Sequence, residues 1–150
     1  QRDGVPYDLI SKSLPTVEGA VNDILAQIVD FSVVFSMNGK DIDTHIVYDD
    51  DRVWSLELSS GMERFISSLA IRIGLMNVSN LPQGNFLAID EGWGTMDSDN
   101  LNSVAQLFQY LKSQFQFTFV VSHIETMRDF VDTLLEIKKI DGSSSVRFSR

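Results

Sequence analysis

Two adjacent carboxylates, Asp90 and Glu91, follow the short apolar run 86–89. If that run is a strand of an open α/β sheet, the pair lies at the carboxyl end of the strand, where such sheets bind ligands. The first carboxylate could hold Mg²⁺ or its water shell, because Mg²⁺ prefers oxygen ligands. The second points elsewhere and could orient or deprotonate an attacking water. The same pattern also fits a solvated loop with two acids.

A histidine closes the next apolar run. His123 follows residues 117–122, which have the continuous apolar character of a central parallel strand, so it is expected on the same rim of the sheet as the acid pair. A neutral imidazole can donate to a phosphate or accept from a water. The alternative is a capping or core histidine. His45, inside a predicted hairpin, is interpreted as structural.

A third constellation is a Ser-Ser-Gly turn, Ser59, Ser60 and Gly61, that opens an amphipathic helix. Unpaired N–H groups and the helix dipole make a helix start a potential anion site, to which serine hydroxyls add donors. The alternative is a simple N-cap. The helix is expected to bury one face, made of Met62, Phe65, Ile66, Leu69, Ala70 and Ile73.

The elements that position these residues can be predicted from periodicity. A helix is expected from Pro15, which suits a first turn. Residues 31–58 predict an antiparallel meander, with a first turn at Asn38-Gly39, a second at 49–51 and a third strand over 52–58. From 86 to 140 the order is strand, helix, strand, short helix, strand, which predicts an α/β arrangement with parallel pairing.

The helix between the first two of these strands is expected to start at a cap, Asp97 or Ser98. Taken in isolation, the segment around Asp97 is an ordinary capped turn. The apolar face of the helix is predicted to consist of Leu101, Val104, Ala105, Phe108 and Leu111.

Bulk composition limits the function classes. The 150 residues suffice for one domain, and 43% hydrophobic with 22% charged residues excludes wholesale disorder. A net charge of −9 argues against strong binding of a nucleic-acid backbone by this chain alone. The absence of cysteine excludes disulfides and thiolate metal sites, and no apolar run is long enough to predict a membrane span. A start at Gln1 suggests a piece of a longer protein.

The order of these features resembles the C-terminal half of an ABC-type ATPase head, with the closest likeness to the SMC/SbcC branch that includes the DNA double-strand-break repair ATPase. The likeness runs from about residue 54 to 139. It implies an α/β lobe with a parallel sheet flanked by helices, preceded by a helix and a small antiparallel meander. This lobe would be 15–150, and 1–14 would be the end of a coiled coil or a lead-in segment.

The resemblance also implies roles. Leu58 to Glu63 would be the ATP-binding signature motif, normally Leu-Ser-Gly-Gly-Gln/Glu, with Ser59 and Gly61 contacting the γ-phosphate held by a second protomer. Here Ser60 replaces a glycine and Met62 replaces a polar residue. Asp90 would be a Mg²⁺ ligand, and Glu91 would be the general base. Asp97 would align the two protomers, and His123 would sense the γ-phosphate.

One part of such a site is absent from the sequence. A P-loop needs Gly-x-x-x-x-Gly-Lys-Ser/Thr, and the only Gly-Lys pair, Gly39-Lys40, lies in a predicted hairpin turn. The resemblance implies that an N-terminal half, separated by a long coiled coil, supplies it, and that this chain alone is inactive. It further implies ATP and Mg²⁺ as cofactors and a second head that is bound through ATP. DNA and an SbcD-type nuclease would be partners of the full complex, and its location would be the cytoplasm and nucleoid or a nucleus.

Three other interpretations stay open. A metal-dependent nuclease or phosphohydrolase could use Asp90, Glu91, Asp97 and Asp99, but no carboxylates from other strands are evident to complete its site. A non-hydrolysing dimerisation scaffold would have no need of Glu91. A transporter-type nucleotide-binding domain would carry its P-loop on the same short chain.

Overall fold

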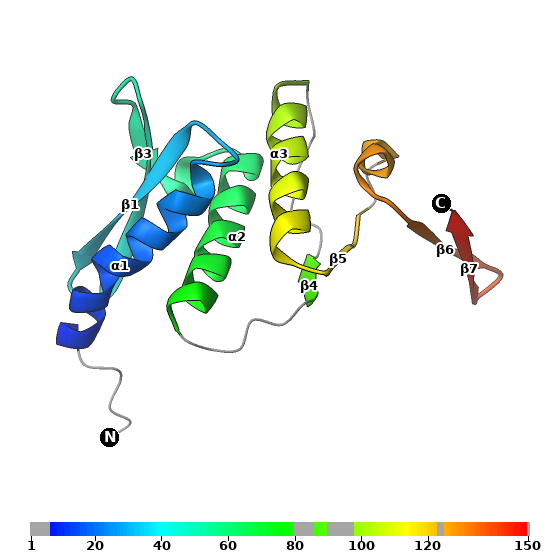
Figure 1. Ribbon diagram of the computed structural model, residues 1–150, viewed down its shortest axis with the longest axis horizontal. Helices are drawn as coiled ribbons and strands as arrows, with labels where there is room; N and C mark the ends of the chain where they lie inside the picture. Colours follow the sequence, from blue (N-terminus) through cyan, green and yellow to red (C-terminus); the bar gives the residue numbers. More distant parts are fainter. Residues whose placement is uncertain (1–6, 80–85, 90–97, 123–124, 150) are drawn as a thin grey trace.

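The computed structural model describes residues 7–79, 86–89, 98–122 and 125–149 (Figure 1). Helices and strands combine in a mixed α/β fold. The two 3₁₀ turns are Leu56–Leu58 and Glu125–Phe130. The helices and strands are α1 (Tyr7–Leu25), β1 (Phe31–Asn38), β2 (Asp41–Tyr48), β3 (Val53–Ser55), α2 (Gly61–Val78), β4 (Phe86–Ile89), α3 (Ser98–Gln114), β5 (Phe117–Val120), β6 (Leu134–Ile140) and β7 (Ser143–Ser149).

The predicted antiparallel meander is confirmed as a three-stranded sheet of order β1-β2-β3. Asn38 pairs with Asp41, so the first turn consists of Gly39 and Lys40, one residue later than predicted. Gly39 has a φ of 62°, which glycine adopts without a steric penalty. The Gly-Lys pair thus lies in a hairpin turn, as predicted. The third strand is shorter than predicted, because the chain turns into a 3₁₀ helix after Ser55.

The first helix begins earlier than predicted. α1 starts at Tyr7, and Pro15 lies in its interior rather than in its first turn. Proline lacks an N–H and normally weakens a helix interior. Further along the helix, Asn22 bonds both backbone groups of Val33, with 2.8 Å from its Oδ1 to the N–H and 3.0 Å from its Nδ2 to the carbonyl. Glu18 accepts from the N–H of Phe35 at 3.0 Å. α1 is therefore fixed to the edge of β1.

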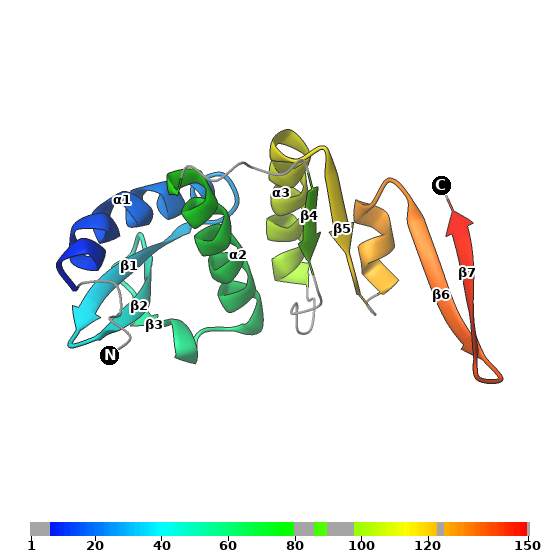
Figure 2. The ribbon, with the colours of Figure 1, turned by 90° about the horizontal axis from the view of Figure 1, so that it is seen from below.

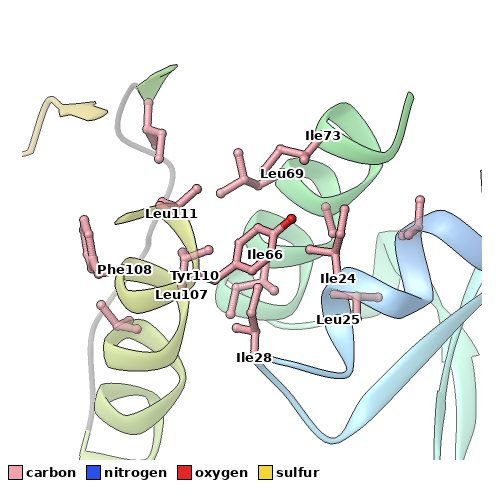
Figure 3. Packing of buried hydrophobic residues seen from close by; sticks show 14 of the residues in the cluster. Ile24, Leu25, Ile28, Ile66, Leu69, Ile73, Leu107, Phe108, Tyr110 and Leu111 are labelled. Carbon is pink, nitrogen blue, oxygen red and sulfur yellow. The ribbon is translucent and has the colours of Figure 1, made fainter. Parts of the chain in front are cut away.

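The core lies where α1, α2 and α3 meet, and Figure 3 shows side chains of all three helices gathered around Ile66. The predicted buried face of α2 is confirmed, with only Phe65 partly exposed. α1 and α2 approach closely at Gly74, where a Cβ atom would lie 2.9 Å from Val21 Cγ2. On α3 the prediction for Ala105 is wrong. Ala105 is exposed, whereas Val104, Phe108 and Leu111 are buried as predicted, and Leu107 is buried with them.

β4 and β5 form a parallel pair, as predicted, with Ile89 opposite Val120 (Figure 2). α3 connects them and packs on one face. The other face is uncovered, since Phe117 is 59% and Phe119 56% exposed, so the prediction of a strand buried on both faces is wrong for this chain.

Parallel pairing of the last predicted strand is also wrong. β6 has the predicted bounds but pairs antiparallel with β7, as a separate hairpin beyond β5 (Figure 2). Its turn is Asp141-Gly142, and both residues have positive φ, 49° and 80°. An Asp-Gly turn of this kind favours a tight hairpin, and it pairs β6 locally instead of with the parallel sheet.

Within the described residues, no helix combines the length and apolar character needed to cross a membrane.

Candidate functional site

The predicted Ser-Ser-Gly turn forms the start of α2, and Ser60 is its N-cap. Ser60 Oγ accepts from the N–H of Glu63 at 3.2 Å, and the Ser60 N–H donates to Glu63 Oε1 at 2.9 Å. This reciprocal arrangement is a capping box, and it satisfies two of the four donors that a helix start leaves without intrahelical partners. The helix start is therefore held rigidly by side chains that lie three residues apart.

Two backbone N–H groups of the same turn, those of Gly61 and Met62, are open in the sense that no described residue accepts a hydrogen bond from them. The N–H of Arg64 bonds the Ser60 carbonyl at 3.0 Å and so begins the regular helical pattern. In the part of the chain that the structure describes, the N–H groups of Gly61 and Met62 have no acceptor. These open amides lie at the positive end of the helix dipole, which favours an anion.

Ser59 precedes the cap and is 9% exposed. Its hydroxyl donates to the Leu56 carbonyl at 2.5 Å, and its N–H donates to the same oxygen at 3.2 Å. The 3₁₀ turn Leu56–Leu58 that supplies this carbonyl is itself capped by Ser55. Leu58, in contrast, is 82% exposed, so the side chain before the serines projects into solvent.

Tyr48, at the end of β2, joins the sheet to this turn. Its hydroxyl donates to Glu63 Oε2 at 2.8 Å, so both carboxylate oxygens of Glu63 are engaged. Burial, and then the hydrogen bond and charge of Glu63, raise the pKa of Tyr48 above its ordinary value. The phenol therefore stays protonated and remains a donor at physiological pH.

Sequence reasoning did not identify this aromatic support. The Tyr48 ring lies 5.5 Å from that of Phe31 and 5.1 Å from that of Trp54, centroid to centroid. Arg52 lies over it, with its guanidinium carbon 4.9 Å from the ring centroid, and also pairs with Asp50. The hydrogen bond from Arg52 lowers the pKa of Asp50. The only signal in the sequence is the alternation of the meander, which does not predict a contact with Glu63.

The start of α2 also borders a cavity. Its volume is about 280 Å³, and its lining includes Tyr48, Arg52, Met62 and Glu63. The carboxylate of Glu63 therefore has empty space beside it, and packing alone does not fix its position.

The other predicted site residues, Asp90, Glu91, Asp97 and His123, lie outside the described residues, so their roles stay predictions. The described strands before them pair as expected, since β4 ends at Ile89 and is hydrogen-bonded in parallel to β5. Arg72 of α2 donates to the Ala88 carbonyl at 3.1 Å and connects the helix with β4. Among the described residues, no group of three or more His, Asp or Glu side chains could hold a metal ion.

Curated relatives of this chain include a viral and a bacterial protein. The uncharacterized protein R555 of Acanthamoeba polyphaga mimivirus is 34% identical over 160 residues, which cover 96% of this chain. The SbcC component of the nuclease SbcCD of Staphylococcus aureus is 30% identical over 123 residues, which cover 79% of this chain. The chain spans 12% of the length of each relative. No protein-family model matches the sequence.

The fold also matches solved structures. A chain from a study of ATP-driven dimerization and DNA-stimulated activation of SMC ATPases superposes with a TM-score of 0.74 at 17% identity. The match covers 95% of this chain and 89% of that one. At this identity the likeness establishes the fold, and it confirms the predicted α/β class.

Proposed function

We propose that this chain, which belongs to the SMC/SbcC family of ABC-type ATPase heads as the C-terminal half of such a head, contributes to an ATP-hydrolysing site between two heads. ATP turnover there would drive a conformational change that serves DNA repair or chromosome organisation. The observation that carries the proposal is the capped start of α2. It leaves two backbone donors open within the predicted signature residues.

The donors of this turn suit a triphosphate. The open N–H groups of Gly61 and Met62, together with the helix dipole, favour a multiply charged anion. Ser60 Oγ accepts from Glu63, and its hydroxyl proton is still available for donation to a phosphate oxygen. We therefore assign Ser59, Ser60 and Gly61, the signature turn, to the nucleotide held by a second head. Ser59 can reach a phosphate with its proton only by releasing the Leu56 carbonyl.

The acidic residues after β4 would serve the nucleotide of the same head. Asp90 is the proposed ligand of Mg²⁺, which when bound neutralises phosphate charge. Glu91 would accept the proton of the attacking water. Asp97 would align the two heads, and His123 would hydrogen-bond the terminal phosphate. The parallel pairing of β4 with β5 supports this assignment, because the strands that precede Asp90 and His123 are direct neighbours.

The proposed site needs further partners. The sequence has no P-loop, so we propose that an N-terminal half of the same head supplies it, and that two heads join through ATP. DNA and an SbcD-type nuclease are the proposed partners of the full complex, in the cytoplasm and nucleoid or in a nucleus.

The first test compares this chain alone with a mixture of the chain and the P-loop half of its head. We expect ATP hydrolysis and ATP-dependent dimers, measured by phosphate release and light scattering, only in the mixture. Hydrolysis by the chain alone would contradict the proposal, and so would a mixture that neither hydrolyses ATP nor dimerises with it. Metal-dependent DNA cleavage would instead support the nuclease interpretation.

The second test is Glu91→Gln in the reconstituted head. Loss of the general base is expected to lower ATP turnover by about 100-fold or more. ATP still binds, so ATP-bound dimers should accumulate. The charge-matched control is Asp23→Asn, since Asp23 lies on α1, far along the chain from the acid pair. Unchanged turnover in Glu91→Gln would remove Glu91 from the role of base.

A further inference from the structure

The Tyr48 ring is packed on several sides, independently of the contact that its hydroxyl makes. Phe31 and Trp54 pack against it at centroid distances of 5.5 and 5.1 Å, and the Arg52 guanidinium lies 4.9 Å from its centroid. Such ring pairs and cation–π contacts each contribute favourably at this spacing. The hydroxyl therefore projects from a fixed platform on the sheet toward the start of α2.

A short series of hydrogen bonds runs from this hydroxyl into the signature turn. Tyr48 donates to Glu63 Oε2 at 2.8 Å, Glu63 Oε1 accepts from the Ser60 N–H at 2.9 Å, and Ser60 Oγ accepts from the Glu63 N–H at 3.2 Å. The first two bonds are accepted by the charged carboxylate of Glu63, so they are stronger than hydrogen bonds between neutral groups. The orientation of the turn is thus set by the sheet as well as by the helix.

The position of the Glu63 carboxylate matters for a phosphate ligand. A negative charge in the first helical turn stabilises the helix, but it repels a second anion at the same end. The cavity of about 280 Å³ beside Glu63 would let an untethered carboxylate change rotamer. Tyr48 draws the carboxylate toward the sheet, and the Gly61 and Met62 amides stay open.

We propose that Tyr48 is a positioning residue for the signature turn. It acts through Glu63, whose carboxylate it holds in the capping box and away from the nucleotide. The inference rests on the proposed function and refines it: Glu63 supports the ATP contact and does not make it.

The test is Tyr48→Phe in the complete head with its P-loop half, because phenylalanine keeps the ring contacts and removes only the hydroxyl. We expect ATP-dependent dimerisation to weaken about tenfold, as for loss of a hydrogen bond to a charged group. ATP binding by the undimerised head should not change, since that nucleotide contacts a P-loop and the signature turn belongs to the other head. A general loss of structure would reduce both.

Two further variants complete the test. Tyr110→Phe removes a hydroxyl from a buried ring on α3 and should leave dimerisation unchanged. In a Glu63→Ala background, Tyr48→Phe should have little further effect, because no acceptor remains at that position for the Tyr48 hydroxyl to hold. In the 150-residue chain, Tyr48→Phe should also accelerate hydrogen exchange of the Ser60 amide.

The outcomes separate the two proposals. If wild-type heads form ATP-dependent dimers and Tyr48→Phe does not weaken them, the role of Tyr48 is overturned and the proposed function stays intact. Equal effects of Tyr48→Phe in the wild-type and Glu63→Ala backgrounds would overturn its action through Glu63. If wild-type heads neither dimerise with ATP nor hydrolyse it, the proposed function and the inference are both overturned.

Discussion

In residues 7–79, the helices and the meander are joined by buried side chains and by hydrogen bonds from side chains to backbone. The described part of residues 86–149 shares in the core through Leu87, Ile89 and α3. Both regions expose single large apolar side chains, but in the second region Phe117, Phe119 and Val121 are exposed at every second residue along β5 and just after it. The first region contains the signature turn, and the second contains the strands that precede the proposed hydrolytic residues.

This difference indicates that the signature turn is positioned by this chain alone, whereas the strands beside the proposed catalytic residues are only half covered. A contiguous exposed apolar surface often marks an interaction site. It fits the proposal that an N-terminal half of the head joins this chain and supplies the P-loop. Four changes to the chain can break or sharpen the comparison.

The largest effect is expected from Ile66→Ala in the first region. Ile66 is 1% exposed at the meeting point of the three helices, so the substitution leaves a cavity and should cost about 2–5 kcal/mol of unfolding free energy. Urea unfolding followed by circular dichroism measures this. The control is Ile42→Ala on the exposed part of β2, which should cost far less. Equal costs would show that the described core does not hold this region together.

Gly74→Ala tests the contact between α1 and α2. The new methyl group would lie 2.9 Å from Val21 Cγ2 and 3.3 Å from Val21 N, and the backbone atom cannot move aside. We expect a loss of about 1–3 kcal/mol from overpacking. Gly19→Ala on α1 is the matched control: nothing lies within 4 Å of its Cβ position, so it should stabilise the helix by up to about 1 kcal/mol. Thermal unfolding of both variants gives the comparison, and a stabilised Gly74→Ala would contradict it.

Asn22→Ala removes both hydrogen bonds between Asn22 of α1 and Val33 of β1 and keeps the one between Glu18 and Phe35. The N–H and carbonyl of Val33 would lose their partner in a half-buried setting, at a cost of about 1–3 kcal/mol. Gln27→Ala, which loses only an exposed bond to the Asp23 carbonyl, is the control. Hydrogen exchange should accelerate at Val33 in Asn22→Ala alone. Unchanged protection would mean that packing, and not these bonds, fixes α1 to the sheet.

The smallest effect is expected in the second region. Phe117→Ser removes a side chain that is 59% exposed on the uncovered face of β5, so the isolated chain should lose less than about 1 kcal/mol. Once the P-loop half is added, the same change should weaken the assembly of the head, measured by titration of one half with the other. A large loss in the isolated chain would show that the face is already covered, and the comparison would fail.

Local patterns predicted much of the fold because they act over a few residues. The period of the apolar residues specified α2, and the Ser-Ser-Gly turn indicated where it starts, with an N-cap as one of the two interpretations. The capping box between Ser60 and Glu63 was not predicted, although the serine followed three residues later by glutamate is its sequence signal. Alternation and turn residues specified the meander. The Asp141-Gly142 turn was readable in the same way, but the predicted elements ended at residue 140, and β6 was wrongly assigned to the parallel sheet.

The sequence by itself determined the α/β class, the helix start that carries Ser59, Ser60 and Gly61, and the order of chemical groups that the SMC/SbcC family shares. The tertiary structure decided how far α1 extends around Pro15, that Leu107 and not Ala105 joins the buried face of α3, and that Tyr48 reaches Glu63. The physical reason is distance along the chain. Caps and turns join residues two to four apart, whereas Tyr48 and Glu63 are fifteen residues apart and meet only after the sheet and α2 have packed together.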